Sequence, residues 1–168
     1  ANPDVSKAAT SLDYSSIRPL AEQGDAVAQI RLGLMYASGI GVVKNDAEAV
    51  RWFRLAADQG LADAQLILAI MYENGVGISI NDAEAVRLYK LAANQGVAKA
   101  QHYLGLRYVG GRGVAKNDAE AARLFRLAAD QGLAEAQFHL AVMYGSGNGV
   151  AKSFSQAFIW FQLAANQG

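Results

Sequence analysis

The two histidines are the side chains of this sequence best suited to chemistry, because imidazole binds metals and transfers protons near neutral pH. His102 and His139 occupy two similar segments, offset by one position, so folding can bring them together across a groove. A zinc site needs further protein ligands at a recognisable spacing, and no third ligand is evident. We therefore expect both histidines to be surface or partly buried residues without a bound metal.

Pairs of glycines separated by one residue are a second candidate for a functional site, because glycine-rich turns at helix starts can hold phosphate groups. A dinucleotide-binding motif requires a preceding strand and a third glycine. Residues 39–44 (Gly-Ile-Gly-Val-Val-Lys) instead follow a helical pattern and lack the third glycine. We interpret them as a turn that needs a positive φ. The pairs are Gly39/Gly41, Gly75/Gly77, Gly111/Gly113 and Gly147/Gly149.

The Asp-Ala-Glu-Ala segments at residues 46–49, 82–85 and 118–121 look like paired catalytic carboxylates. Each lies at a predicted helix start, where capping and the helix dipole already account for the acids. The sequence has no cysteine, which excludes disulfides, thiolate zinc sites and cysteine nucleophiles. It also has no nucleophilic serine turn and no phosphate-binding loop. We expect no catalytic residue, no cofactor and no enzyme activity.

Composition narrows the possible partners. Lys+Arg and Asp+Glu number 15 each, so no overall field attracts nucleic acid or an anionic membrane. The longest apolar run, residues 66–72, is far shorter than the roughly 20 residues that span a bilayer, and we expect no transmembrane segment. The chain starts at Ala1 without an initiator methionine, which favours a periplasmic or secreted location over a cytoplasmic one.

A repeat of 36 residues positions all of these side chains, and its end is marked by Gln-Gly at 23–24, 59–60, 95–96, 131–132 and 167–168. In the first half, positions 28, 29, 32, 33 and 36 fall on one side of a helix over roughly residues 26–37. The residue after the central leucine is always small, which lets a neighbouring helix approach closely. These small residues are Gly33, Ala69, Gly105 and Ala141.

The second half of each repeat is predicted to be a helix with a capping box, as in Asn45 followed by Glu48. It should end at the glycine of Gln-Gly in the left-handed conformation. Pro19 lies in an N-terminal copy of this second helix, which predicts that the helix is kinked or begins late. The last copy, residues 153–156, departs most from the pattern.

Short linkers require consecutive helices to run antiparallel, and each helix pair has apolar residues left over for its neighbours. The sequence therefore predicts an all-α solenoid of antiparallel helix pairs. We expect an N-terminal segment, 1–12, and a single repeat domain over 13–168. The domain divides into a half-repeat, 13–24, and repeats 25–60, 61–96, 97–132 and 133–168. Because the final helix leaves an apolar side uncovered, we expect the natural chain to continue beyond Gly168.

The repeat resembles the Sel1-like repeat, a relative of the 34-residue tetratricopeptide repeat. The pattern that carries the resemblance is Ala-x-Ala-Gln-x-x-Leu-Gly/Ala-x-x-Tyr, then Gly-x-Gly-Val, then Asp-Ala-Glu-Ala and Leu-Ala-Ala-x-Gln-Gly. The resemblance covers about residues 13–168. It implies a right-handed α/α superhelix in which the first helix of each repeat lines a concave face that binds proteins or peptides. It carries over no catalytic residue.

Positions of the first helix that differ between copies are the candidates for contact with a partner, because those that hold the fold recur. Stacked helices would align them into a ribbon that mixes aromatic, aliphatic and charged side chains. Met35, Met71 and Met143 fit either the ribbon or the core. The predicted partner-binding residues are Arg31, Asp63, Ile67, Lys99, Tyr103, Arg107, Glu135 and His139.

The preferred function is a monomeric scaffold for a protein or peptide partner. Two alternatives remain open from the sequence. One is a cell-envelope enzyme or a module that binds peptidoglycan or another carbohydrate, for which a buried acid pair or carboxylates with perturbed pKa values would be the discriminating feature. The other is a purely structural spacer without a partner.

Overall fold

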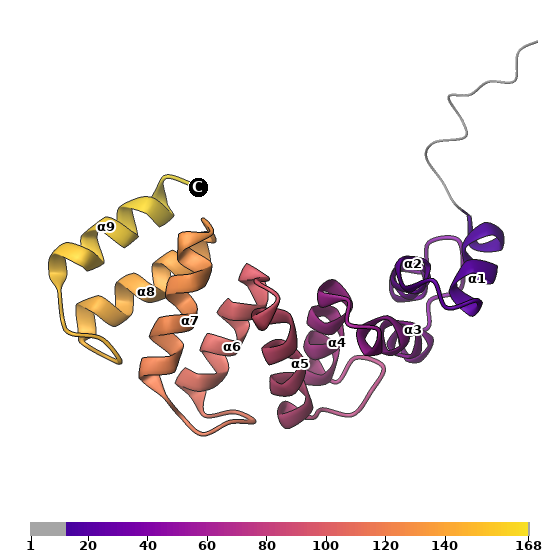
Figure 1. The fold of residues 1–168 in the computed structure, drawn as a ribbon, viewed down its shortest axis with the longest axis horizontal. Helices are drawn as coiled ribbons and strands as arrows, with labels where there is room; N and C mark the ends of the chain where they lie inside the picture. The colour runs from indigo at the N-terminus through magenta and orange to yellow at the C-terminus, as the bar shows by residue number, and fades with distance from the viewer. Residues whose placement is uncertain (1–12, 168) are drawn as a thin grey trace, which may run out of the picture.

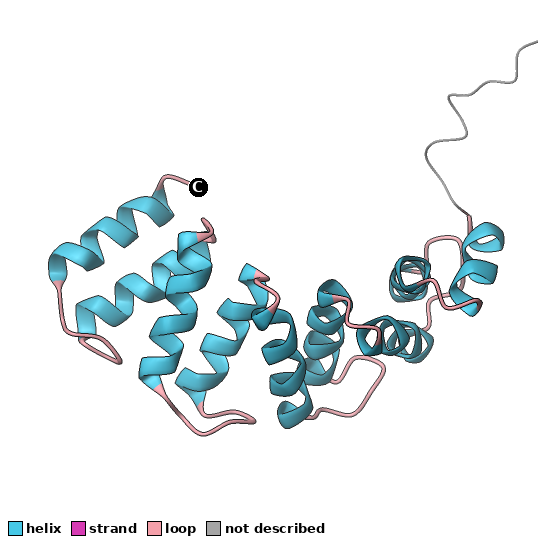
Figure 2. Cartoon of the chain, in the orientation of Figure 1, coloured by secondary structure: helices cyan, strands magenta, loops and turns pink. Residues whose placement is uncertain are grey.

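The computed structural model describes residues 13–167, and Figure 1 shows them as an arc of helices from α1 to α9. Within the described residues there are nine α-helices and no strand (Figure 2), which confirms the all-α prediction. The predicted N-terminal segment, 1–12, lies outside the described residues. The helices are α1 (Tyr14–Glu22), α2 (Ala26–Ser38), α3 (Asp46–Asp58), α4 (Ala62–Asn74), α5 (Asp82–Asn94), α6 (Ala98–Gly110), α7 (Asp118–Asp130), α8 (Ala134–Ser146) and α9 (Phe154–Ala165).

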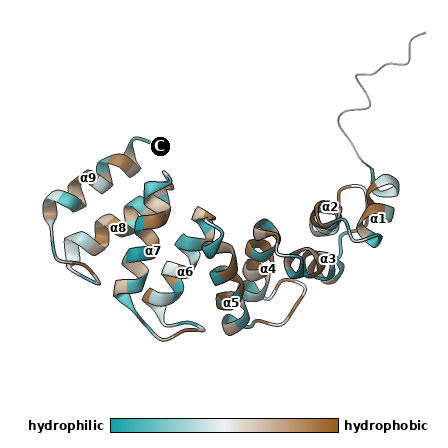
Figure 3. Cartoon of the chain, viewed as in Figure 1, coloured by the Kyte–Doolittle hydropathy of each residue, from teal (hydrophilic) through white to brown (hydrophobic). Residues whose placement is uncertain are grey.

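The helices stack in chain order. Each one packs mainly against the helix before it and the helix after it, so the described helices form serial layers and the predicted solenoid is confirmed. Helices α2, α4, α6 and α8 are the first helices of the four repeats, and α3, α5, α7 and α9 are the second helices. Apolar and polar residues alternate along most helices (Figure 3), as expected for helices with a packed and a solvated side.

The second helix of each repeat starts with half of the predicted capping box. The Asn45 side chain accepts a hydrogen bond from the Glu48 backbone N–H at 3.1 Å. The reciprocal bond is absent, because the Asn45 N–H donates to the carbonyl of Tyr36 at 2.9 Å, in the last turn of α2. The Glu48 carboxylate instead pairs with Arg51. The prediction of a full capping box was therefore wrong, since the short turn between the helices offers the N–H a carbonyl that itself lacks a partner.

The end of each second helix follows the prediction. Gly60 has φ of +91° and its N–H donates to the Ala57 carbonyl, while the Leu61 N–H donates to the Ala56 carbonyl. This pair of bonds is a Schellman motif, in which a left-handed glycine lets the chain reverse and satisfies two end carbonyls. The same pair of bonds recurs at Gly24, Gly96 and Gly132.

Two glutamines in each repeat form a hydrogen-bond relay that the sequence analysis did not anticipate. The buried Gln65 of α4 donates to the Ala57 carbonyl of α3 at 3.2 Å and accepts from Gln95 at 2.8 Å. Gln95, which caps α5, also donates to the Gly60 carbonyl at 3.0 Å. Each relay therefore ties three consecutive helices together through one buried and one exposed glutamine amide. The bond between glutamines recurs between Gln29 and Gln59, Gln101 and Gln131, and Gln137 and Gln167.

The second glycine of three Gly-x-Gly turns, Gly77, Gly113 and Gly149, lies against the backbone of the preceding repeat. A Cβ atom placed on Gly113 would lie 2.2 Å from the carbonyl oxygen of Asp82, and one on Gly77 would lie 2.3 Å from that of Asp46. Both glycines have positive φ, which confirms the turn interpretation. Only glycine permits this approach, so the backbones of adjacent repeats touch directly at these three turns.

The two glycines at the small position of the first helices face aromatic rings of the second helices. A Cβ atom on Gly33 would lie 2.8 Å from the Phe53 ring, and one on Gly105 would lie 2.6 Å from the Phe125 ring. Met71 and Met143 are buried, so these two methionines belong to the core and not to the ribbon. These contacts explain why the small position recurs in every repeat.

Helix α1 is shorter than the other second helices, with 9 residues against 13 in α3. It begins at Tyr14, and the Asp13 carboxylate caps it by accepting from the Ser16 N–H at 3.0 Å. Pro19 lies inside the helix. The late start confirms one of the two outcomes predicted from the proline.

Candidate functional site

The first helices share an exposed side, which we call the helix-A stripe. It comprises three positions of each first helix. They are 27, 31 and 34 in α2, 63, 67 and 70 in α4, 99, 103 and 106 in α6, and 135, 139 and 142 in α8. Of the eight predicted residues, seven lie on it. Arg31, Asp63, Lys99 and Glu135 are exposed, and Ile67, Tyr103 and His139 are half-buried.

Arg107 does not lie on the helix-A stripe, because only 7% of it is exposed. Its guanidinium pairs with the Glu73 carboxylate of α4 and lies 3.7 Å from the Asp82 carboxylate of α5. Glu73 also accepts a hydrogen bond from the hydroxyl of Tyr89 at 2.6 Å. Burial raises the pKa of Tyr89, and the bond to Glu73 raises it further, so the tyrosine remains a donor. Arg107 is an interior residue of the boundary between the second and third repeats.

The third row of the stripe is aliphatic in every repeat. The exposed fractions of Leu34 and Val142 are 49% and 44%, while Ile70 and Leu106 are partly buried. Only the two central residues of this row are partly covered. The stripe thus combines a continuous aliphatic row with charges beside it.

Two stripe residues rest on rings of the preceding second helix. Tyr103 stacks on Tyr89 with ring centroids 5.5 Å apart and planes at 27°. His139 stacks on Phe125 with centroids 5.2 Å apart and planes at 20°. Each side chain therefore buries one face against the core and keeps part of its surface on the stripe.

The two histidines meet, as their spacing predicted. The rings of His102 and His139 lie 5.2 Å apart and at 29°. Burial lowers the pKa of His102 to about 4, with a smaller contribution from His139, and burial also lowers the pKa of His139. Both imidazoles are therefore neutral near pH 7. Within residues 13–167 no three histidine, aspartate or glutamate side chains converge to hold a metal ion.

The carboxylates with shifted pKa values do not have the property of a catalytic acid. A hydrogen bond from Arg87 lowers the pKa of Glu84, and one from Arg123 lowers that of Glu120. A general acid at neutral pH needs a raised pKa instead. These pairs lie on the outer sides of α5 and α7, where they are exposed surface ion pairs.

Recesses occur at both ends of the described solenoid. One of about 170 Å³ is lined by Arg31 and Val27 of α2 together with Ile17 and Leu20 of α1. Another of about 440 Å³ lies between α8 and α9, with Phe138 and Phe161 in its lining. The uncovered apolar side of the last helix is predictable from the sequence, but this recess is not, because it depends on where the turn places the two helices.

Four consecutive stretches of the chain match the Sel1 repeat, at residues 26–61, 62–97, 98–133 and 134–168. The chain belongs to the Sel1 repeat family. Each matched stretch contains one helix pair, from α2 and α3 to α8 and α9, which confirms the resemblance inferred from the motifs. Sel1 repeat proteins are generally non-enzymatic scaffolds for protein–protein interactions.

Solved structures of Sel1 repeat proteins share the fold. A protective antigen of uropathogenic Escherichia coli strains, described as displaying an SLR fold, is 39% identical, with a TM-score of 0.92 over 94% of this chain and 34% of that chain. A Sel1 repeat protein from Oxalobacter formigenes is 36% identical, with a TM-score of 0.87 over 92% of this chain and 63% of that chain. The chain thus spans about a third and just under two thirds of these two proteins.

A more distant match shows similarity of fold alone. Helicobacter pylori cysteine rich protein B is 20% identical, with a TM-score of 0.57 over 76% of this chain and 96% of that chain. No curated protein shows significant similarity to this sequence. None of the helices in residues 13–167 has the length and apolar character needed to cross a bilayer.

Proposed function

We propose that the chain is a scaffold that binds a protein or peptide partner along the helix-A stripe. The observation that carries this proposal is a set of four charged side chains without ion-pair partners among the described residues. Arg31, Asp63, Lys99 and Glu135 lie on four successive first helices, whereas most arginines of the second helices are paired or bonded to neighbouring side chains. Charges that the fold does not use are available to a partner.

The stripe also offers the apolar surface that binding requires. The aliphatic row from Leu34 to Val142 runs beside the charges, and Tyr103 and His139 present ring surface between them. Interfaces draw most of their affinity from a few apolar or aromatic anchors and take specificity from surrounding polar groups. The stripe has both kinds of residue within reach of one extended or helical peptide.

The sign of the charge alternates along the stripe. Arg31 and Lys99 are positive, while Asp63 and Glu135 are negative. A partner with the opposite alternation would bind in a single register, because a shift by one repeat would place like charges opposite each other. A uniformly charged partner, such as nucleic acid, would be repelled at every second repeat.

The experiment that tests this proposal is selection of peptides from a displayed random library against the 168-residue chain. We expect the selected peptides to lose at least about tenfold in affinity for a variant with Asp63→Lys and Lys99→Asp, because both register-setting charges are reversed. The matched control is Glu84→Lys with Arg87→Asp, which makes the same exchange at an exposed pair on the second helix α5. Peptides that bind the stripe variant as tightly as the unaltered chain would contradict the proposal.

A further inference from the structure

A third recess, of about 300 Å³, lies at the boundary between the third and fourth repeats, beside α7 and the turn that follows α8. Its lining includes two arginines, Arg123 and Arg126, and the apolar residues Ala119, Ala122, Leu140 and Val150. Arg123 forms an exposed ion pair with Glu120. Arg126 forms no ion pair with a carboxylate of residues 13–167. The recess therefore combines an apolar lining with a cation whose charge the described part of the chain does not neutralise.

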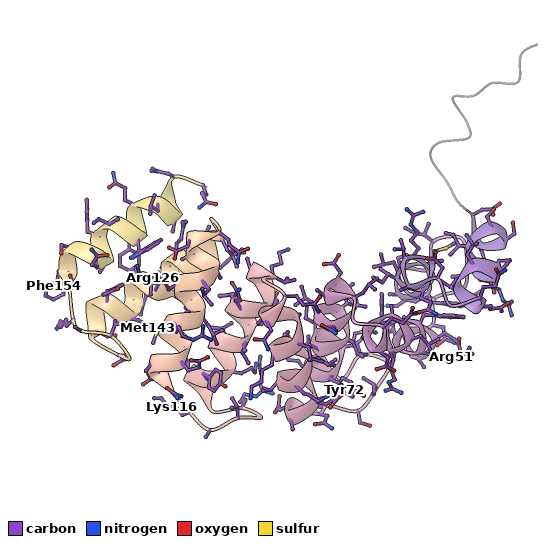
Figure 4. All side chains as sticks on the ribbon, in the orientation of Figure 1. Arg51, Tyr72, Lys116, Arg126, Met143 and Phe154 are labelled. Carbon is purple, nitrogen blue, oxygen red and sulfur yellow. The ribbon has the colours of Figure 1, made fainter. Side chains whose placement is uncertain are left out.

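Two aromatic rings hold Arg126 in place. Its guanidinium lies 5.5 Å from the ring centroid of Tyr144 and 5.1 Å from that of Trp160, and it donates a hydrogen bond to the Tyr144 hydroxyl. The side chain thus lies where α7 meets α8 and α9 (Figure 4). Its Nε is buried and has no acceptor among the described residues. Aromatic faces attract a cation but leave its charge in place, so the guanidinium keeps its affinity for an anion.

Two differences from the earlier repeats distinguish this boundary. Helix α7 has Ala122 where α3 and α5 have Val50 and Val86, so the lining lacks the branched methyl groups that fill the same place before it. Helix α9 has Trp160 where α5 and α7 have leucine, and its indole covers one side of the guanidinium. Arg126 is accordingly half-buried and lies in a recess instead of on an open surface.

A further repeat of the same chain would not supply the missing anion. Arg54 and Lys90 are the copies of Arg126 at the first two boundaries between repeats, and at least one complete repeat follows each of those boundaries. Both side chains nevertheless remain exposed and have no ion-pair partner among the described residues. Arg54 donates to the Tyr72 hydroxyl at 2.9 Å, and Lys90 lies 5.8 Å from the ring centroid of Tyr108. Succeeding repeats leave this position uncovered, so the anion comes from outside the repeat array.

The chain shows elsewhere which group completes a guanidinium beside a tyrosine hydroxyl. Arg107 pairs with the Glu73 carboxylate, which also accepts a hydrogen bond from the Tyr89 hydroxyl at 2.6 Å. Arg126 and Tyr144 supply the same two kinds of donor at the recess. The Tyr144 hydroxyl accepts from Arg126, so its own hydrogen is available to a second acceptor. The group that would complete this set is a glutamate carboxylate.

We propose that the recess binds the side chain of a glutamate from a protein partner, whose carboxylate pairs with Arg126 and accepts a hydrogen bond from the Tyr144 hydroxyl. The methylene groups of the glutamate lie on the apolar lining, and the shorter aspartate side chain has fewer of them to bury there. The proposal adds a second site to the scaffold function and rests on it, because the ligand is part of a protein. The recess shares no residue with the helix-A stripe, so either site can fail without the other.

A short glutamate peptide tests the recess directly. The probe is acetyl-Ala-Glu-Ala amide, titrated into the nitrogen-15-labelled 168-residue chain. Binding is followed by nuclear magnetic resonance through the backbone signals of Gly149 and Val150 and the side-chain N–H signal of Arg126. The control probe is acetyl-Ala-Gln-Ala amide, which has the same shape without the charge. We expect the glutamate peptide to bind at least about tenfold more tightly than the glutamine peptide, since a hydrogen bond between charged groups is lost.

Variants of the chain locate the binding. Arg126→Gln is expected to weaken the glutamate peptide at least about tenfold, and glutamine fits this position because α9 has Gln162 there. Ala122→Val restores the residue of α3 and α5, and it should weaken binding by filling the recess while the charge is kept. Arg54→Gln is the matched control, since it makes the same change at the same position of α3. Circular dichroism and the melting temperature show whether each variant is folded, and Ala122→Val keeps the test valid if Arg126→Gln is not.

Four results would overturn the proposal. They are the absence of a saturable shift at the recess, equal affinity for the two peptides, an equal loss with Arg54→Gln, and sodium acetate binding as tightly as the glutamate peptide, which would mean an adventitious ion only. The stripe variant with Asp63→Lys and Lys99→Asp should bind the glutamate peptide as the unaltered chain does. Displayed peptides that do not depend on Asp63 and Lys99 would remove the stripe, whereas only this titration decides the recess.

Discussion

Replacement of Arg107 by methionine is expected to lower the free energy of unfolding by about 3 kcal/mol. Methionine occupies this position in the other three repeats, so the side chain itself fits. The cost arises because Glu73, whose side chain is only 18% exposed, would keep its charge without the guanidinium that neutralises it. Breaking a buried pair in this way costs about 3–5 kcal/mol, and the residual exposure of Glu73 places the effect at the lower end.

The second half of this prediction is a rescue. The double variant Arg107→Met with Glu73→Ala should recover most of the loss, because the boundary between the first and second repeats has Ala37 and Met71 at these two positions. The assay is urea unfolding followed by circular dichroism, with the four chains compared as a double-mutant cycle. The control is Arg123→Met, which breaks an exposed pair with Glu120 and should cost about 0.5 kcal/mol or less.

Two results would refute the reasoning. If Arg107→Met alone is as stable as the unaltered chain, the arginine is not an interior partner of Glu73. If the double variant is no more stable than the single one, the loss comes from packing and not from the unpaired carboxylate. Only the first result would return Arg107 to the set of residues available for binding.

Three further predictions concern the repeat framework. Gly60→Ala should lower the free energy of unfolding by about 1 kcal/mol. Gly113→Ala should lower it by more, since the new Cβ atom would lie 2.2 Å from a carbonyl oxygen of the preceding repeat. Equal losses for the two variants in urea unfolding would contradict the inter-repeat contact. Gln101→Leu should cost about 1–3 kcal/mol by removing its two hydrogen bonds, one to the Ala93 carbonyl and one from Gln131. An unchanged melting temperature would rule out the relay. His102 binds protons less readily when folded, because its pKa is lowered from 6.5 to about 4. The contribution of neutral His102 to the free energy of unfolding is therefore present above about pH 6.5 and is lost as pH falls toward 4. His102→Phe should flatten this part of the curve of stability against pH by about 2 kcal/mol. Identical curves for the variant and the unaltered chain would exclude the effect.

The architecture could be predicted because its determinants are local and repeated. The glycine of Gln-Gly and the Asn of the second-helix start each act within a few residues, and both adopted the expected conformations at every described copy. Four copies in one register turn weak local signals into a strong one. The missing half of the capping box shows the limit, because the competing carbonyl of Tyr36 comes from another helix.

The relay of glutamines could not be predicted in the same way. Gln65 and Gln95 recur in every repeat, but their recurrence does not say that they bond to each other or to the turn at Gly60. That arrangement needs the positions of three helices in space. A glutamine that recurs on the packed side of every repeat nevertheless predicts a hydrogen-bond partner, since buried amides are kept only where they find one.

Arg107 was misplaced because variation between copies was taken as freedom from packing. The second and third repeats differ from the others at three positions together, with Glu73, Tyr89 and Arg107 in place of apolar or small residues. In the structure these side chains form one buried network. Differences that occur together in neighbouring copies thus indicate compensation inside the fold, whereas isolated differences such as Asp63 and Lys99 remain at the surface.

The contact of the second turn glycine with the preceding backbone has a consequence for how such a chain changes over time. Since Gly77, Gly113 and Gly149 meet main-chain atoms, this backbone contact is the same at the three junctions between full repeats, whatever side chains the two modules carry. Modules can therefore be duplicated, deleted or exchanged by recombination while this backbone contact is kept. The external residues of each module are then free to diversify, and new recognition properties can be assembled from existing parts.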